Sequence, residues 1–128
     1  MSMSEEPQNL SRAKKNMDLL TSRKWRYQRV IYDGKEKTPP NHLVEFRKDG
    51  KYIQRRGEKI IAEAPWKLSD NGVQIIINWG RTSTRAFIAV SESKLVLKGV
   101  TPMCRLGGGR FEETMVAVED EDRLEDAV

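Results

Sequence analysis

Cysteine and histidine are almost missing from this chain of 128 residues, which contains only Cys104 and His42. One cysteine excludes an intramolecular disulfide, and one residue of each type excludes the clusters that hold structural zinc. Cys104 has no accompanying His or Asn pattern of a nucleophilic site, and His42 follows Pro39-Pro40-Asn41 in an expected loop. We therefore expect a protein without metal, without cofactor and without enzymatic activity.

Long apolar runs are also missing. No stretch reaches the length of a signal-peptide core or of a membrane-spanning helix. This pattern predicts a cytoplasmic protein without a membrane span, although a leader removed from the chain would leave no trace in it. We also expect a monomer and, from the length, one domain. Three Trp, three Tyr and three Phe supply large anchors for its core.

Acidic and basic residues are unevenly distributed. Residues 119–128 contain six acidic groups and one arginine, whereas residues 1–118 contain 22 basic and 13 acidic groups. A basic body attracts nucleic acids or other anionic partners, and an acidic tail of this composition is typically solvated and disordered. We divide the chain into a flexible N-terminus (1–9), a folded domain (10–118) and the acidic tail (119–128).

The first periodic segment is typical of a helix. Its apolar residues recur at intervals of three and four, at Leu10, Ala13, Met17 and Leu20. This spacing predicts a helix over residues 10–22, with Asn9 or Ser11 as the N-cap. Because the apolar stripe is narrow, we expect the helix to lie on the surface of the rest of the domain and to close one end of it.

From Lys24 onward the apolar period changes from helical spacing to two, as in β-strands. Eight stretches follow this period, at residues 24–33, 42–48, 51–56, 60–68, 73–79, 84–90, 94–99 and 110–118. Asp49-Gly50 predicts a tight hairpin, and most other connections are also short. Short connections favour an all-β fold, namely an eight-stranded antiparallel up-and-down β-barrel with a short N-terminal helix.

The inward parity changes within the first strand. Trp25 and Tyr27 fall on one face, and Val30 falls on the other. An extra residue near Gln28 or Arg29, a β-bulge, would re-aim the strand and return both sets to the same side of the sheet. We therefore predict a bulge at this point.

The order of several short motifs resembles a known family. The motifs are Leu20-Thr21-Ser22-Arg23-Lys24-Trp25, Asp33-Gly34-Lys35, Phe46-Arg47-Lys48-Asp49-Gly50-Lys51-Tyr52, Trp66 to Gly72 and Leu95 to Lys98. Together they span residues 20–99 and resemble the small bacterial lipocalin-like proteins of the calycin group. The resemblance implies an eight-stranded barrel with a helix across one end and a cavity for a small apolar molecule. The chain departs from the lipocalin pattern at Arg23, where lipocalins usually have a glycine two residues before the first-strand tryptophan.

The large inward residues are the candidates for a binding site. With two arginines they form the set that we predict to bind a ligand, namely Trp25, Tyr27, Arg29, Phe46, Trp66, Ile77, Trp79, Arg85 and Phe87. The apolar members would equally fill a solid core, because interiors are normally densely packed. Arg29 or Arg85, if turned inward, would pair with a ligand carboxylate, whereas the bulge would turn Arg29 to solvent.

A second class of function is nucleic-acid binding. Basic and aromatic residues alternate in Lys24-Trp25-Arg26-Tyr27 and again around Tyr52, as on a platform that stacks bases and contacts phosphates. If the strands pair as predicted, however, the aromatic side chains face inward and the basic ones outward. A solvated basic surface then explains the same residues.

Two further motifs lack catalytic chemistry. The run from Cys104 to Gly109 has neither the Lys-Ser/Thr ending nor the helix of a phosphate-binding loop, so we expect a flexible turn. Glu112 and Glu113 are neighbours on the last strand, point to opposite faces and cannot act as an acid/base pair. Our leading hypothesis is a non-enzymatic lipocalin-like barrel that binds a small hydrophobic or amphipathic molecule. The alternative is an interaction module that binds a nucleic acid or an acidic partner through its basic surface.

Overall fold

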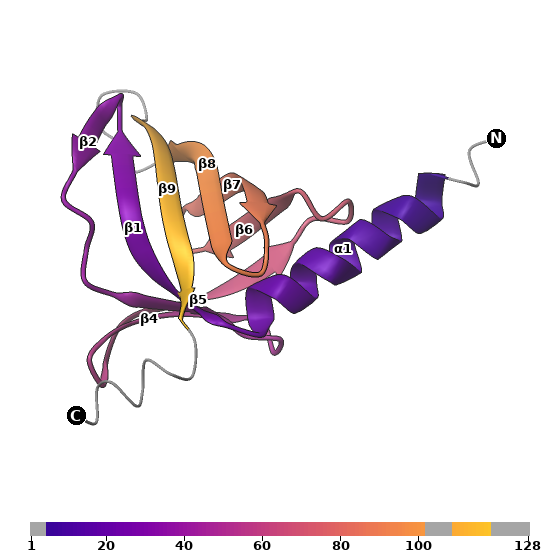
Figure 1. Cartoon of the computed structure of the whole chain (residues 1–128), viewed down its shortest axis with the longest axis horizontal. Coiled ribbons are helices and arrows are strands. Elements are labelled where there is room, and N and C mark those ends of the chain that lie inside the picture. Colours follow the sequence, from indigo (N-terminus) through magenta and orange to yellow (C-terminus); the bar gives the residue numbers. More distant parts are fainter. Residues whose placement is uncertain (1–4, 102–108, 119–128) are drawn as a thin grey trace.

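The computed structural model describes residues 5–101 and 109–118, with side chains described over residues 11–100 and 109–118. Within these residues, one helix is followed by nine strands (Figure 1). The elements are α1 (Glu5–Thr21), β1 (Lys24–Tyr32), β2 (Lys35–Lys37), β3 (Leu43–Phe46), β4 (Lys51–Arg56), β5 (Lys59–Leu68), β6 (Gln74–Asn78), β7 (Ser83–Val90), β8 (Lys94–Thr101) and β9 (Gly109–Val118). Cys104, the glycines at 107 and 108 and the acidic tail lie outside the described residues.

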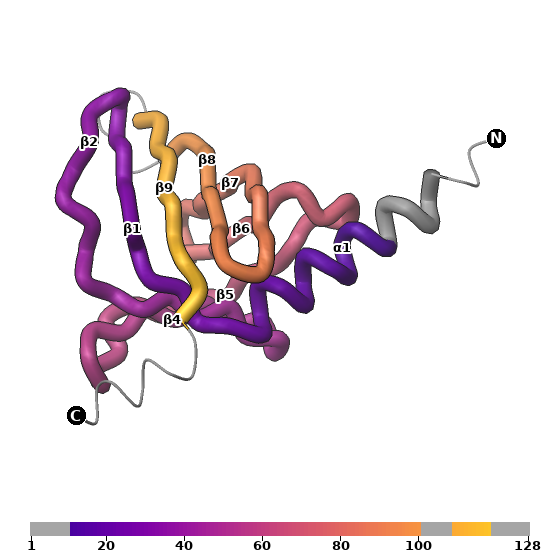
Figure 2. Tube along the Cα trace, viewed as in Figure 1, coloured from indigo at the N-terminus to yellow at the C-terminus, as the bar shows by residue number. Residues whose placement is uncertain are grey.

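Eight of the strands close into a barrel. Each of β3 to β8 pairs antiparallel with the next strand, β3 also pairs with β1, and β1 pairs with β9 along the whole length of β1. The predicted eight-stranded up-and-down barrel is therefore confirmed. The three-residue strand β2 was expected to be part of a loop. It pairs with β1 at Val30–Tyr32, beyond the segment that pairs with β3, and Figure 2 traces the long connection that leads from it to β3.

The first strand contains the predicted bulge. Its pairing with β9 shifts between Tyr27 and Arg29, so that Tyr27 lies opposite Met115 and Arg29 lies opposite Thr114. Val30 is consequently buried on the same side of the sheet as Tyr27. The extra residue thus lets one long strand keep its apolar side chains inward on both sides of the bend.

The helix begins earlier than predicted. It starts at Glu5, so Asn9 and Ser11 lie inside it and the prediction that one of them is the N-cap was wrong. Pro7 is tolerated in the first turn because that turn has no partner for its missing N–H. The helix thus extends N-terminally beyond its apolar stripe, and Figure 1 shows its N-terminal part leading away from the barrel.

The C-terminal part of α1 closes one end of the barrel, as predicted. Leu20 is fully buried, and Trp25 Nε1 donates a hydrogen bond to its carbonyl oxygen at 3.1 Å. Asn16 Nδ2 donates to the carbonyl oxygen of Gly72 at 2.7 Å, which ties the helix to the turn between β5 and β6. Gly72 has φ +79°, and a Cβ built on it would lie 2.6 Å from the Cα of Ala13. Only glycine fits this crossing without a shift of backbone.

Much of the fully buried core lies toward this sealed end. Its fully buried members there are Leu20, Trp25, Val44, Phe46, Ile75, Leu95 and Met115. Phe46 packs edge-on against Trp66, with ring centroids 5.0 Å apart. Each large apolar side chain buried in this way contributes roughly 1.5–3 kcal/mol to folding.

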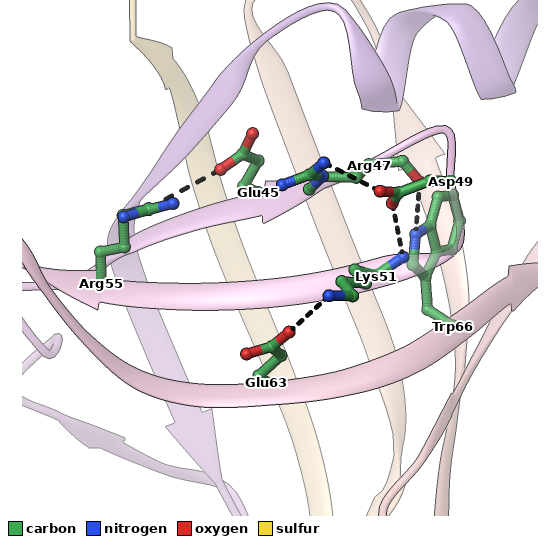
Figure 3. A network of polar contacts seen from close by, with 7 residues as sticks. All are labelled: Glu45, Arg47, Asp49, Lys51, Arg55, Glu63 and Trp66. Carbon is green, nitrogen blue, oxygen red and sulfur yellow. Dashed lines mark hydrogen bonds and ion pairs between the residues drawn. The ribbon is translucent and has the colours of Figure 1, made fainter.

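Ion pairs cover the outer face of the hairpin formed by β3 and β4 (Figure 3). Arg47 pairs with Asp49 at 2.8 Å, and Lys51 pairs with Glu63 at 3.2 Å. Trp66 Nε1 donates to the carbonyl oxygen of Arg47 at 2.9 Å, so the indole closes the hairpin from the core side. The sealed end is therefore apolar inside and charged outside.

Candidate functional site

A cavity of about 330 Å³ opens at the other end of the barrel. Its inner wall is apolar and comes from four neighbouring strands, with Ile75, Ile77, Ala86, Leu97 and Phe111. Its polar lining consists of Tyr27, Tyr32, Tyr52, Gln54, Thr84 and Glu113. Trp79 stands at the rim, 40% exposed, with its Nε1 donating to Thr84 Oγ1 at 2.9 Å. The cavity thus combines an apolar floor with a ring of hydrogen-bonding groups.

An amide joins two of the tyrosines. Gln54 Nε2 donates to Tyr52 Oη at 2.6 Å and to Tyr27 Oη at 3.3 Å, while His42 Nδ1 lies 3.3 Å from Gln54 Oε1. Burial raises the pKa of Tyr27 well above its ordinary value and raises that of Tyr52 to about 12. Both phenols are therefore neutral at physiological pH and keep an O–H that can donate.

A carboxylate occupies the opposite wall. Glu113 lies across from Val30 on one neighbouring strand and from Leu97 on the other, which places it on the inner face. Tyr32 Oη donates to Glu113 Oε2 at 2.8 Å. Burial raises the pKa of Glu113, and the hydrogen bond from Tyr32 partly opposes that change. Burial, followed by the nearby Glu113 charge, also raises the pKa of Tyr32.

The neighbouring glutamate points outward. Glu112 pairs with Lys98 on the outer surface at 3.9 Å, whereas Glu113 lines the cavity. The two carboxylates therefore face opposite sides of the sheet, as predicted. Glu113 itself makes no ion pair with any side chain that the structure describes.

The nine predicted ligand-binding residues fall into three groups. Tyr27, Ile77 and Trp79 line the cavity. Trp25, Phe46 and Trp66 belong to the packed core and do not line the cavity. The remaining three, Arg29, Arg85 and Phe87, lie on the outer face.

The inward placement expected for Phe87 was wrong, whereas Arg29 and Arg85 have the outward placement that was the alternative to binding a ligand carboxylate. The bulge turns Arg29 outward, where its side chain is 55% exposed and its Nη2 donates to Glu36 Oε1 at 3.3 Å. In β7 the inward positions are the even-numbered ones, with Ala86 buried and Phe87 59% exposed. Apolar residues stand at both odd and even positions of this strand, so the large ring of Phe87 led to the prediction that the odd-numbered side chains face inward. Arg85 lies on the same outward face as Phe87.

Five lining residues with polar or amphipathic side chains were missed: Tyr32, Tyr52, Gln54, Thr84 and Glu113. Their positions could have been found by counting every second residue along the strand from a neighbouring inward apolar residue. Tyr32 follows Val30 by two positions beyond the bulge, and Glu113 stands midway between two inward apolar residues of β9, Phe111 and Met115. Polar residues at inward positions indicate where the interior is not solid.

The outer surface carries the basic residues. Trp25, Tyr27 and Tyr52 are buried, so the stacking platform considered above has no accessible rings at these positions. A separate outer groove of about 450 Å³ runs between β5, β6 and the start of β7. Lys67, Arg81 and Arg85 line it, which makes it the basic counterpart of the acidic cavity inside.

Over the described ranges, no group of three or more His, Cys, Asp or Glu side chains is placed to hold a metal ion. No α-helix in that part of the chain has the length and hydropathy needed to cross a bilayer.

Comparison with known proteins supports the fold. Among solved structures, the chain is similar to bovine odorant binding protein in complex with its natural ligand, with a TM-score of 0.52 and 17% sequence identity. The match covers 85% of this chain and 79% of the bovine protein. No protein-family model matches the sequence, and no curated protein matches it. The barrel is lipocalin-like, which confirms the fold implied by the sequence motifs.

Proposed function

We propose that this protein binds a small hydrophobic or amphipathic molecule in the cavity at the open end of the barrel. The observation that carries the proposal is the cavity itself, about 330 Å³ enclosed by inward side chains. This volume lies at the lower end of the range typical of small-molecule sites, which are mostly apolar with a few placed polar groups. The lining combines five apolar residues with polar side chains that are held by hydrogen bonds to one another, in keeping with that description.

The architecture supports the same use. The bovine protein that shares the fold is an odorant binding protein, solved with its natural ligand. A barrel of eight strands is just wide enough to hold one small ligand when its interior is not filled by side chains. Here the sealed end is filled and the open end is not, so the ligand would lie above Ile75 and Ile77 and below the rim residue Trp79.

A cavity-filling variant tests the proposal. Ala86 lies on the inner face of β7, and Ala89 lies on the outer face of the same strand, exposed. We expect Ala86→Phe to reduce the affinity for the neutral dye N-phenyl-1-naphthylamine at least tenfold, because the new ring occupies the ligand volume. Ala89→Phe is the matched control and should bind the dye as the wild type does.

Dye fluorescence titration measures both variants, with thermal unfolding confirming that each is folded. Lack of dye binding by the wild-type protein, or equal affinity of the two variants, would contradict the proposal. Chemical-shift changes of the Trp79 indole N–H on titration would place the dye at the rim.

The outer groove favours a second candidate function, the binding of an anionic partner such as a nucleic acid. Lys67, Arg81 and Arg85 line it, and none of them forms an ion pair with a side chain in the described ranges. Phosphate contacts of this kind weaken steeply with salt. A mobility shift of a single-stranded oligonucleotide at low salt, lost in the triple alanine variant, would support this function. No shift at low salt would dismiss it.

A further inference from the structure

The charge inside the cavity restricts the kind of ligand. Glu113 is the one acidic side chain among the lining residues, and the lining contains no Lys, Arg or His from the described residues. The titratable groups that face Glu113 are tyrosines: Tyr32 bonds it directly, and Tyr27 and Tyr52 stand within electrostatic reach across the cavity. Its strand neighbours on the inner face, Val30 and Leu97, are apolar. The interior is therefore negative when Glu113 is ionised.

Aromatic rings surround the same space. Tyr52 and Trp79 meet edge to face, with ring centroids 5.9 Å apart and an interplanar angle of 89°. Tyr27, Tyr32 and Phe111 complete the aromatic lining. Aromatic rings around a cavity attract organic ammonium groups when the cation lies over a ring face.

We propose that the cavity selects a small organic amine, with its ammonium group on Glu113 and the tyrosine rings and its apolar part on the floor of Ile75, Ile77 and Leu97. This inference rests on the proposed function and adds the chemical class of the ligand. An ammonium ion supplies the positive partner that Glu113 lacks among the described side chains. It also donates hydrogen bonds to the carboxylate, and charge-assisted bonds of this type are the strong ones.

The same arrangement disfavours fatty acids and other carboxylates. The two arginines that would have anchored a carboxylate, Arg29 and Arg85, both lie on the outer face. A carboxylate brought into the cavity would meet the Glu113 charge at short range in a partly desolvated site, which is unfavourable. The sign of the ligand charge is thus the sharpest test.

Three probes of nearly equal shape supply that test. They are 2-phenylethylamine, the neutral 2-phenylethanol and the anionic 3-phenylpropionate, each titrated by calorimetry into the wild-type protein at neutral pH. We expect the amine to bind at least tenfold more tightly than the alcohol, and the carboxylate to bind most weakly. Tighter or equal binding of the alcohol or the carboxylate would overturn the amine proposal while leaving the proposed function intact.

A matched pair of variants assigns the effect to one side chain. Glu113→Gln should reduce amine affinity about tenfold or more and leave binding of 2-phenylethanol within about threefold, because the amide keeps the shape and loses the charge. Glu112→Gln removes the adjacent outward carboxylate and should change neither. Equal amine binding by wild type and Glu113→Gln would overturn the inference.

The pH dependence provides a second readout. Lowering the pH protonates Glu113, so amine affinity should fall in the wild type and stay flat in Glu113→Gln over the same range. Binding of none of the three probes, together with failure of the neutral dye to bind, would instead refute the proposed function itself.

Discussion

The two ends of the barrel are built from the same strands and the same inward alternation, yet they have opposite interiors. At the sealed end the indoles of Trp25 and Trp66 are buried and donate to backbone carbonyl oxygens. At the open end the indole of Trp79 is 40% exposed and donates to a side-chain hydroxyl. The period of two along each strand thus decides which side chains face inward, whereas the presence or absence of α1 over that end decides whether they pack into a solid core.

Whether the inward residues are apolar or polar depends on whether α1 covers that end of the barrel. Where α1 excludes water, the inward positions of β1 and β9 hold Trp25 and Met115, both fully buried. Toward the open end the same two strands place Tyr32 and Glu113 inward, and these polar groups satisfy each other. An uncovered interior tolerates polar side chains because water or a ligand can reach them.

The largest effect should come from truncating a tryptophan at the sealed end. We expect Trp25→Ala to lower the free energy of unfolding by about 3–5 kcal/mol, because it leaves a large cavity and an unpaired Leu20 carbonyl. Trp79→Ala at the open end should cost less than about 1.5 kcal/mol, since the ring is partly exposed and its loss enlarges an existing cavity. Urea unfolding measures both, and equal costs would show that the two ends do not differ in packing.

The two ends can also be compared by the stability lost on replacing a glycine that has a left-handed backbone conformation. Gly72 lies beneath α1 with Ala13 against it, whereas Gly57, in the hairpin at the open end, has φ +63° and nothing within 4 Å of a built Cβ. We expect Gly57→Ala to cost only the conformational penalty, about 1 kcal/mol. Gly72→Ala should cost about 2–4 kcal/mol because the methyl group also displaces the helix. Thermal unfolding tests the ranking, and a larger loss for Gly57→Ala would contradict the contact with α1.

The buried carboxylate at the open end should give a pH-dependent difference in stability. Folding raises the pKa of Glu113, so the folded state favours the protonated form of this side chain. The contribution of Glu113 to the free energy of unfolding therefore declines as the pH rises through the raised pKa. Glu113→Gln removes this dependence, so its stability relative to the wild type should increase from pH 4 to pH 7. Glu112→Gln, on the outer face, is the control in parallel urea titrations. If the stability of Glu113→Gln relative to the wild type did not change with pH, burial would not raise the pKa of Glu113.

The smallest effect should come from the ion pairs outside the sealed end (Figure 3). Lys51 and Glu63 are both about half exposed, so solvent and salt screen their 3.2 Å contact. A double-mutant cycle with Lys51→Ala and Glu63→Ala should give a coupling of about 0.2–1 kcal/mol that decreases in high salt. A coupling above that range would show that charges outside, and not only packing inside, distinguish the sealed end.

Much of the fold could be predicted from local patterns. The period of two, the Asp49-Gly50 hairpin and the parity change before Val30 led to eight strands and one bulge, all of which the structure confirms. Predictions failed where local patterns were ambiguous. Residues 83–90 carry apolar side chains on both faces, and α1 begins at Glu5, before the first residue of its apolar stripe.

The candidate site was less predictable than the barrel. The large apolar residues could either bind the ligand or fill the core, and their pattern in the sequence did not separate Trp25, Phe46 and Trp66, which fill the core, from those that line the cavity. Glu113, which supplies the negative charge in the cavity, and its hydrogen-bond partner Tyr32 lie far apart in the sequence. They meet only because β1 pairs with β9. No local pattern reports such a contact.

The strand periodicity and the turns follow from the amino-acid sequence alone, because they depend on the spacing of apolar residues and on backbone preferences at glycine and proline. Closure of the barrel is a long-range pairing of β1 with β9. Only the tertiary structure decided which end is solid and which is hollow. That choice depends on where α1 packs and on which distant side chains share an inward face, and both are properties of the assembled barrel rather than of any segment.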